Sequence, residues 1–231
     1  HINFPPYERR RENGFMAEDS VQGRLAAILA ADVVGYSHMM SVDEVGTLSR
    51  LKSLRRESFD PQTKQNGGQI FKTTGDGAFV EFKSAVGAVK SAVDIQKAVA
   101  ARNTGVTENQ KILLRIGISL GDAIVEGSDL YGNGVNVASR MEGLAEPGGI
   151  CVPGNVHEHI GRSLDVDFED MGEQTVKNID QPVRCYRVHL EPAGTSGAPP
   201  PQLSKKPSIA VLPFTNMSGD SDQEKYSDGV T

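Results

Sequence analysis

Two apolar segments that each lead to an aspartate constrain the fold of this 231-residue chain more than any other feature. The first is the run 25–34, in which Asp32 is the single charged residue, and the second is the stretch 69–82. The second is interrupted by Thr74-Gly75-Asp76-Gly77, which is favourable turn chemistry. Long apolar runs are typical of strands that are buried on both faces. The pattern predicts a central strand and a hairpin that deliver Asp32 and Asp76 to one edge of a sheet.

These two aspartates allow a functional and a purely structural interpretation. Mg²⁺ binds carboxylate oxygens and leaves positions open for substrate phosphates, and two such ions about 4 Å apart serve phosphoryl transfer. An aspartate between glycines is also an ordinary turn residue. Taken alone, Asp76 is better explained as a turn residue, so the metal hypothesis depends on the remainder of the sequence.

Helix and strand patterns alternate between residues 22 and 190. A capping serine at Ser41 predicts a helix that Pro61 kinks or ends, and apolar spacing predicts a second helix over 84–101. The later elements are predicted as strands at 112–119, 150–152, 166–169 and 183–188, a turn at 121–122 and a helix over 135–144. This order is the split βαβ arrangement of ferredoxin-like α+β folds, with strands and a helix appended.

Composition excludes several classes of function. The net charge of −6 disfavours binding to a nucleic-acid backbone, which requires clustered Lys and Arg. No apolar run approaches the roughly 18 residues of a membrane span. Cys151 and Cys185 lack metal-ligand spacing, and we expect reduced, packed thiols in a cytoplasmic protein. The basic stretch Arg50 to Arg56 is interpreted as one solvated helix face.

The two ends of the chain differ from its centre. Residues 1–21 are expected to be a flexible N-terminal segment or a cloning remnant. Residues 191–207 have the Pro- and Gly-rich composition of a linker. The strand-like start of 208–231 suggests the severed beginning of a second domain, so C-terminal regions of a longer protein are candidates for binding regulators.

Two motifs closely resemble the class III nucleotide cyclase catalytic domain. They are Phe71-Lys72-Thr73-Thr74-Gly75-Asp76-Gly77 and Asp129-Leu130-Tyr131-Gly132-Asn133-Gly134-Val135-Asn136-Val137-Ala138-Ser139-Arg140-Met141. The resemblance covers about residues 22–190 and includes Ala31-Asp32-Val33-Val34-Gly35-Tyr36-Ser37. It implies a ferredoxin-like core that works as a head-to-tail homodimer with two composite sites.

The resemblance also implies a role for each candidate residue. Two Mg²⁺ or Mn²⁺ ions per site would be held by Asp32, Asp76 and the backbone carbonyl of Val33. The adenine ring would be read by Lys72 and Asp129, while Asn136 orients the ribose and Arg140 stabilises the transition state. Phosphates would contact Gly35, Tyr36 and Ser37, and Lys177 aligns so loosely that a surface lysine is the better interpretation.

The activity implied is that of an adenylate cyclase in signal transduction. The ribose 3′-oxygen of ATP would attack the α-phosphate, which gives 3′,5′-cyclic AMP and pyrophosphate. Guanylate cyclase is one alternative, disfavoured because guanine-specific relatives typically carry Glu at the position of Lys72. A non-catalytic, nucleotide-binding regulatory domain is another, disfavoured because such copies usually lose a metal aspartate or the arginine.

Overall fold

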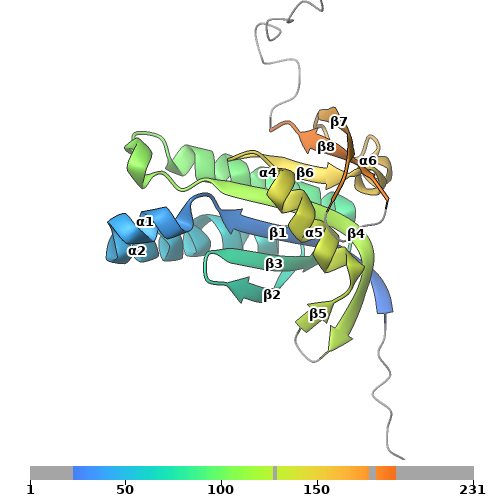
Figure 1. The fold of residues 1–231 in the computed structure, drawn as a ribbon, viewed down its shortest axis with the longest axis horizontal. Helices are drawn as coiled ribbons and strands as arrows, with labels where there is room; N and C mark the ends of the chain where they lie inside the picture. The colour runs from blue at the N-terminus through green and yellow to red at the C-terminus, as the bar shows by residue number, and fades with distance from the viewer. Residues whose placement is uncertain (1–22, 127–128, 177–180, 191–231) are drawn as a thin grey trace, which may run out of the picture. The chain divides into compact units, whose positions relative to one another are not determined.

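The computed structural model describes residues 23–126, 129–176 and 181–190, which form an eight-stranded sheet with helices on both faces (Figure 1). The strands are β1 Gly23–Val33, β2 Gly68–Thr74, β3 Gly77–Phe82, β4 Leu114–Glu126, β5 Asp129–Tyr131, β6 Ile150–Pro153, β7 Phe168–Gln174 and β8 Val183–Val188. The helices are α1 Tyr36–Val42, α2 Glu44–Leu54, α3 Asp60–Gln65, α4 Ala85–Arg102, α5 Asn133–Leu144 and α6 Gly154–Ile160. A π-helical turn, η1 Arg55–Phe59, joins α2 to α3, and a 3₁₀ turn, η2 Glu108–Gln110, precedes β4.

The sheet contains a ferredoxin-like core. Its strand order is β2-β3-β1-β4-β6-β8-β7, with β5 beside β4. Strand β1 lies between β3 and β4 and is antiparallel to both. The first four strands of that order reproduce the split βαβ topology, and β6, β8 and β7 extend it. The predicted α+β fold is confirmed.

Strand β1 is buried on both faces, which explains its continuous apolar sequence. Ala27, Leu29 and Ala31 belong to the core cluster that includes buried residues of α4. The alternate residues Ala26, Ile28 and Ala30 pack on the opposite face, in a cluster that includes Ala138 of α5. Since side chains alternate along a strand, Asp32 lies on the α5 face.

Helix α5 is fixed against β4 by a very close approach at Gly117. A Cβ atom at this position would lie 1.9 Å from the Glu142 nitrogen and 2.3 Å from the Ala138 oxygen. Nearby, the Ser119 hydroxyl donates a 2.6 Å hydrogen bond to the Gly134 carbonyl. Only glycine allows backbones to approach so closely, so the glycine of β4 determines how near α5 lies to the end of β1.

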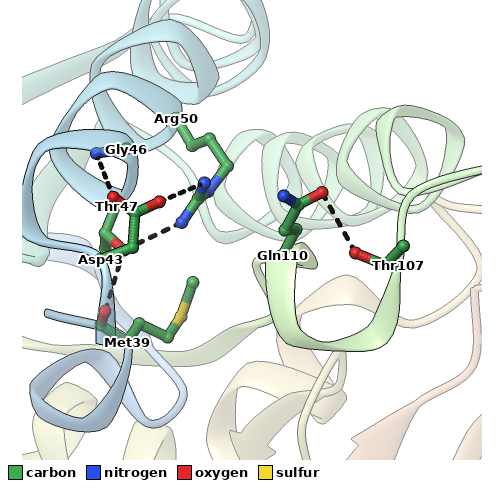
Figure 2. Close-up of polar contacts among 7 residues, drawn as sticks. All are labelled: Met39, Asp43, Gly46, Thr47, Arg50, Thr107 and Gln110. Atoms are coloured by element: carbon green, nitrogen blue, oxygen red, sulfur yellow. Dashed lines mark hydrogen bonds and ion pairs between the residues drawn. The ribbon is translucent and has the colours of Figure 1, made fainter. Parts of the chain in front are cut away.

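Two local predictions are wrong. Asp43, rather than Ser41, caps α2: its carboxylate accepts from the Gly46 amide at 2.9 Å and pairs with Arg50 at 3.1 Å (Figure 2). The break expected at Pro61 takes the form of the widened turn η1 just before the proline, after which α3 continues to Gln65.

The second error concerns Gly121 and Asp122, which lie inside β4 and do not form a turn. They pair with Ala26 and Leu25 of β1. The long ladder between β1 and β4 keeps the backbone extended there, and α5 approaches Gly121 through Gly134. The glycine therefore accommodates packing rather than a reversal of the chain.

The two cysteines are free, buried and packed, as the sequence predicts. Their sulfurs contact the Met141 sulfur at 3.9 Å from Cys151 and 3.6 Å from Cys185. In the part of the chain that the structure describes, no helix has the length and apolar character needed to cross a bilayer. The predictions for residues 1–21, 191–207 and 208–231 concern segments outside the described residues.

Candidate active site

The structure brings Asp32 and Asp76 together at one edge of the sheet. Asp76 lies in the tight turn between β2 and β3, after Gly75 with its positive φ of 66°. The Asp32 and Asp76 side chains lie close enough that the charge of Asp76 raises the pKa of Asp32. A Cβ atom at Gly77 would lie 3.0 Å from the Ala31 oxygen and 3.3 Å from Asp32 Oδ1. The hairpin turn therefore packs directly against the end of β1.

The electrostatics of this pair favour a bound cation. Burial raises the pKa of Asp32, and the charge of Asp76 and the hydrogen bond to it raise the pKa further, against smaller opposing effects from the Val33 amide and Arg115. Two carboxylates held together in this way repel each other unless a proton or a cation lies between them. Within the described ranges, no group of three or more His, Cys, Asp or Glu side chains could hold a metal. One or two carboxylates are a usual protein ligand set for Mg²⁺, so the pair fits this ion.

Two residues that the sequence did not single out join the aspartates. Arg115 of β4 lies opposite Asp32 in the strand register, and its buried Nε has no hydrogen-bond partner. Glu142 of α5 is half-buried, and its pKa is raised to about 7, mainly by burial and then by the charge of Asp32. The charge of Arg115 lowers this pKa, and the charge of Asp76 raises it by a smaller amount. A lone arginine within an apolar strand was the available signal for Arg115. Nothing in the sequence indicated Glu142.

The raised pKa of Glu142 predicts that replacing this residue with a neutral one stabilises the protein, by an amount that depends on pH. A carboxyl whose folded pKa exceeds its unfolded value stabilises the fold while protonated, and this contribution is lost as pH rises towards 7. In metal-free protein, Glu142→Gln should therefore raise the free energy of unfolding by about 1 kcal/mol at pH 8.5, after a discount for partial exposure. The gain should nearly vanish at pH 5.

Urea denaturation in EDTA at both pH values measures this difference. Glu158→Gln, at an exposed position of α6, is the matched control and should show no such pH dependence. Equal effects of Glu142→Gln at pH 5 and pH 8.5 would show that the carboxyl does not carry the raised pKa.

The other predicted residues occupy two separate elements. Lys72 is exposed on β2, opposite Phe79 and directly after a bulge in the strand register. Asn136 is exposed and Arg140 half-buried on α5, one helical turn apart. In the described part of the chain, none of these three side chains forms an ion pair or a hydrogen bond with another. The polar groups of Lys72, Asn136 and Arg140 therefore do not bind one another within one chain.

The remaining candidates are backbone positions or lie outside the description. Gly35 caps α1 with a φ of 68°, and a Cβ there would meet nothing within 4 Å, so its backbone borders open space. The backbone of Asp129 lies in β5, opposite Glu126 of β4. Lys177 lies outside the described residues. The phosphate, metal and base-binding roles stay predictions.

Comparison with known proteins agrees with this fold. A Rhizobium meliloti protein named "Putative adenylate cyclase 3" is 49% identical over 221 residues, which are 94% of this chain and 38% of that protein. A crystal structure from Silicibacter pomeroyi, described as an adenylate/guanylate cyclase/hydrolase, is 44% identical with a TM-score of 0.69 and covers 72% of this chain and 97% of that one. The adenylyl cyclase CyaB of P. aeruginosa, at 23% identity, shares the fold with a TM-score of 0.63, covering 73% of this chain and 95% of its own.

The chain thus spans less than half the length of its Rhizobium relative. The family model described as the adenylate and guanylate cyclase catalytic domain matches residues 21–190, which include both motifs and every strand of the sheet. This chain therefore belongs to the family of adenylate and guanylate cyclase catalytic domains.

Proposed function

We propose that this domain is an adenylate cyclase that converts ATP to 3′,5′-cyclic AMP and pyrophosphate. The observation that carries the proposal is that Asp32 at the end of β1 and Asp76 in the hairpin turn lie together, which suits a shared divalent cation. All six residues of the resemblance are present in one chain. The name of the Rhizobium relative supports the same activity.

Two Mg²⁺ or Mn²⁺ ions per site would be held by Asp32, Asp76 and the carbonyl of Val33. When bound, they would lower the pKa of the ribose 3′-hydroxyl and offset charge on the triphosphate. The chain's own contribution is to hold the two carboxylates in contact, one at the end of β1 and one in the hairpin turn. Bringing both carboxylates to one place before a cation binds is the main benefit of a preorganised site.

The residues of α5, β2 and β5 act on the substrate itself. Arg140 presents a planar fork of donors to charge that develops on the transferring phosphorus. Asn136, one turn earlier, orients the ribose for in-line attack. Lys72 and Asp129 supply one donor and one acceptor for the adenine edge, and a guanine would leave these groups mismatched.

We further propose that the site is completed by a second copy of the chain. One chain would supply Asp32 and Asp76 to each site, and its partner would supply the adenine residues Lys72 and Asp129 together with Asn136 and Arg140. Large apolar side chains are also exposed at the free ends of β1, β4 and β5: Leu25 at 66%, Ile124 at 36% and Tyr131 at 46%. Exposed apolar side chains at the ends of three adjacent strands are candidates for a protein interface, and a head-to-tail homodimer would cover them.

The alternatives have less support. A guanylate cyclase would need a base pocket of the opposite polarity at Lys72, and a non-catalytic domain would not require the complete residue set. We place the protein in the cytoplasm, with regulators acting through other parts of a longer chain. An assay of the purified protein with ATP or GTP, and with Mg²⁺ or Mn²⁺, tests the activity directly.

Base selection gives a sharper prediction. We expect kcat/KM for ATP to exceed that for GTP on the order of a hundredfold, because two mismatched polar contacts cost about 1–3 kcal/mol each. Lys72→Glu should cut ATP turnover and narrow this ratio. Lys83→Glu, an equal charge change at an exposed position just after β3, should leave the ratio unchanged. An ATP/GTP ratio that does not move in Lys72→Glu would remove Lys72 from base reading.

A further inference from the structure

Arg55 lies where an apolar residue would be expected. It follows the buried residue Leu51 by four positions, and residues four apart share one face of a helix. Its side chain lines a small cavity of about 10 Å³ together with Leu51, Leu54 and Asp76. The sequence-based interpretation of Arg50 to Arg56 as one solvated face is therefore wrong for Arg55, which turns inward.

The Arg55 guanidinium binds both sides of the turn that carries Asp76. Nη2 donates hydrogen bonds to the Gly77 carbonyl at 2.7 Å and to the Gly75 carbonyl at 3.3 Å. These two carbonyls belong to the residues directly before and after Asp76. A side chain from a helical segment thus ties down the backbone on either side of a carboxylate in a strand hairpin.

The helix is irregular at the same residue. Arg55 begins the π-helical turn, and its carbonyl accepts a hydrogen bond from the Asp60 amide five residues later. Pro61 explains the widening, since it has no amide hydrogen and its ring would clash with the carbonyl four residues earlier in a regular helix. Such single π turns occur frequently at functional sites. The helical backbone therefore becomes irregular at Arg55, the residue whose side chain binds the hairpin turn.

We propose that Arg55 is a positioning residue that holds Asp76 where it can share a divalent cation with Asp32. The proposal rests on the metal assignment of the proposed function. Without these donors, the Gly75–Gly77 turn would be less well ordered before the cation binds, and the remaining ordering cost would weaken binding. Lysine has no planar fork of donors, so it should replace Arg55 only in part.

Arg55→Met tests the proposal, because methionine preserves an unbranched apolar stem without donors. The probe is Mn²⁺, titrated by electron paramagnetic resonance in the presence of an ATP analogue that lacks the 3′-hydroxyl. We expect Arg55→Met to weaken Mn²⁺ binding about tenfold, the size expected for lost charge-assisted hydrogen bonds. The metal concentration for half-maximal activity should rise in parallel, with a smaller fall in kcat at saturating Mn²⁺.

Arg56→Met is the matched control, because the neighbouring Arg56 is 75% exposed and pairs with Glu57 at the surface. It should bind Mn²⁺ like the wild type, and Arg55→Lys should fall between the wild type and Arg55→Met. If Arg55→Met and Arg56→Met bind Mn²⁺ with equal affinity, the proposal is overturned. If Arg55→Met does not fold, the comparison is made with Arg55→Lys, and an Mn²⁺ affinity equal to that of the wild type overturns the proposal. The Mn²⁺ titration requires no turnover, so a wild type that forms no cyclic AMP refutes the proposed function while this comparison still decides the role of Arg55.

Discussion

Asp32→Asn and Asp76→Asn are each expected to abolish cyclic AMP formation, with a loss on the order of a thousandfold or more. Bound cations contribute several kcal/mol of transition-state stabilisation to reactions of this type. Each variant removes a carboxylate charge from the pair in contact at the end of β1. Turnover with Mg²⁺ and with Mn²⁺ is the measurement, and near wild-type turnover in either variant would contradict the metal assignment.

The same substitution at Asp32 should stabilise the metal-free protein. Burial and Asp76 raise the folded pKa of Asp32 above its unfolded value, so its stabilising protonated state is lost as pH rises through that folded pKa. Near neutral pH the charged carboxyl therefore opposes folding, and asparagine removes that charge. We expect a higher Tm for Asp32→Asn than for wild type in EDTA at pH 7.5. Asp165→Asn, in the exposed loop before β7, is the control and should change neither activity nor Tm.

Mixing two inactive chains should restore activity if the sites are composite. A dimer of Asp76→Ala and Arg140→Ala chains contains one site with both lesions and one with none. Random pairing makes half of the dimers mixed, so we expect about a quarter of wild-type activity per chain. Activity is measured after unfolding and joint refolding, with mixed dimers quantified through two affinity tags.

A second mixture provides the control for this experiment. Asp32→Ala and Asp76→Ala both damage the metal-binding half, so each site in their mixed dimer retains one lesion. This mixture should stay inactive. Absence of recovery in the first mixture, with mixed dimers present, would place each site within a single chain.

Local sequence patterns were sufficient to predict many of the helices and strands. The apolar run of β1, the hairpin around Asp76 and the spacing of α4 all appear as the sequence predicts. These features depend on neighbouring residues, because alternation, helical period and turn chemistry are properties of short segments. The same local reasoning misplaced a turn at Gly121, since the long ladder with β1 and the approach of α5 determine the backbone there.

The sequence by itself determined the family and the identity of the candidate residues, because motif spacing and residue chemistry are recorded in the chain. Only the tertiary structure showed that Asp32 and Asp76 interact, that Glu142 shares their electrostatic environment, and that Arg55 reaches the hairpin turn. The carbonyls that bind Arg55 lie 20 and 22 residues further along the chain. Burial and contact between such distant residues depend on how the elements pack, and no local pattern in the sequence specifies that packing.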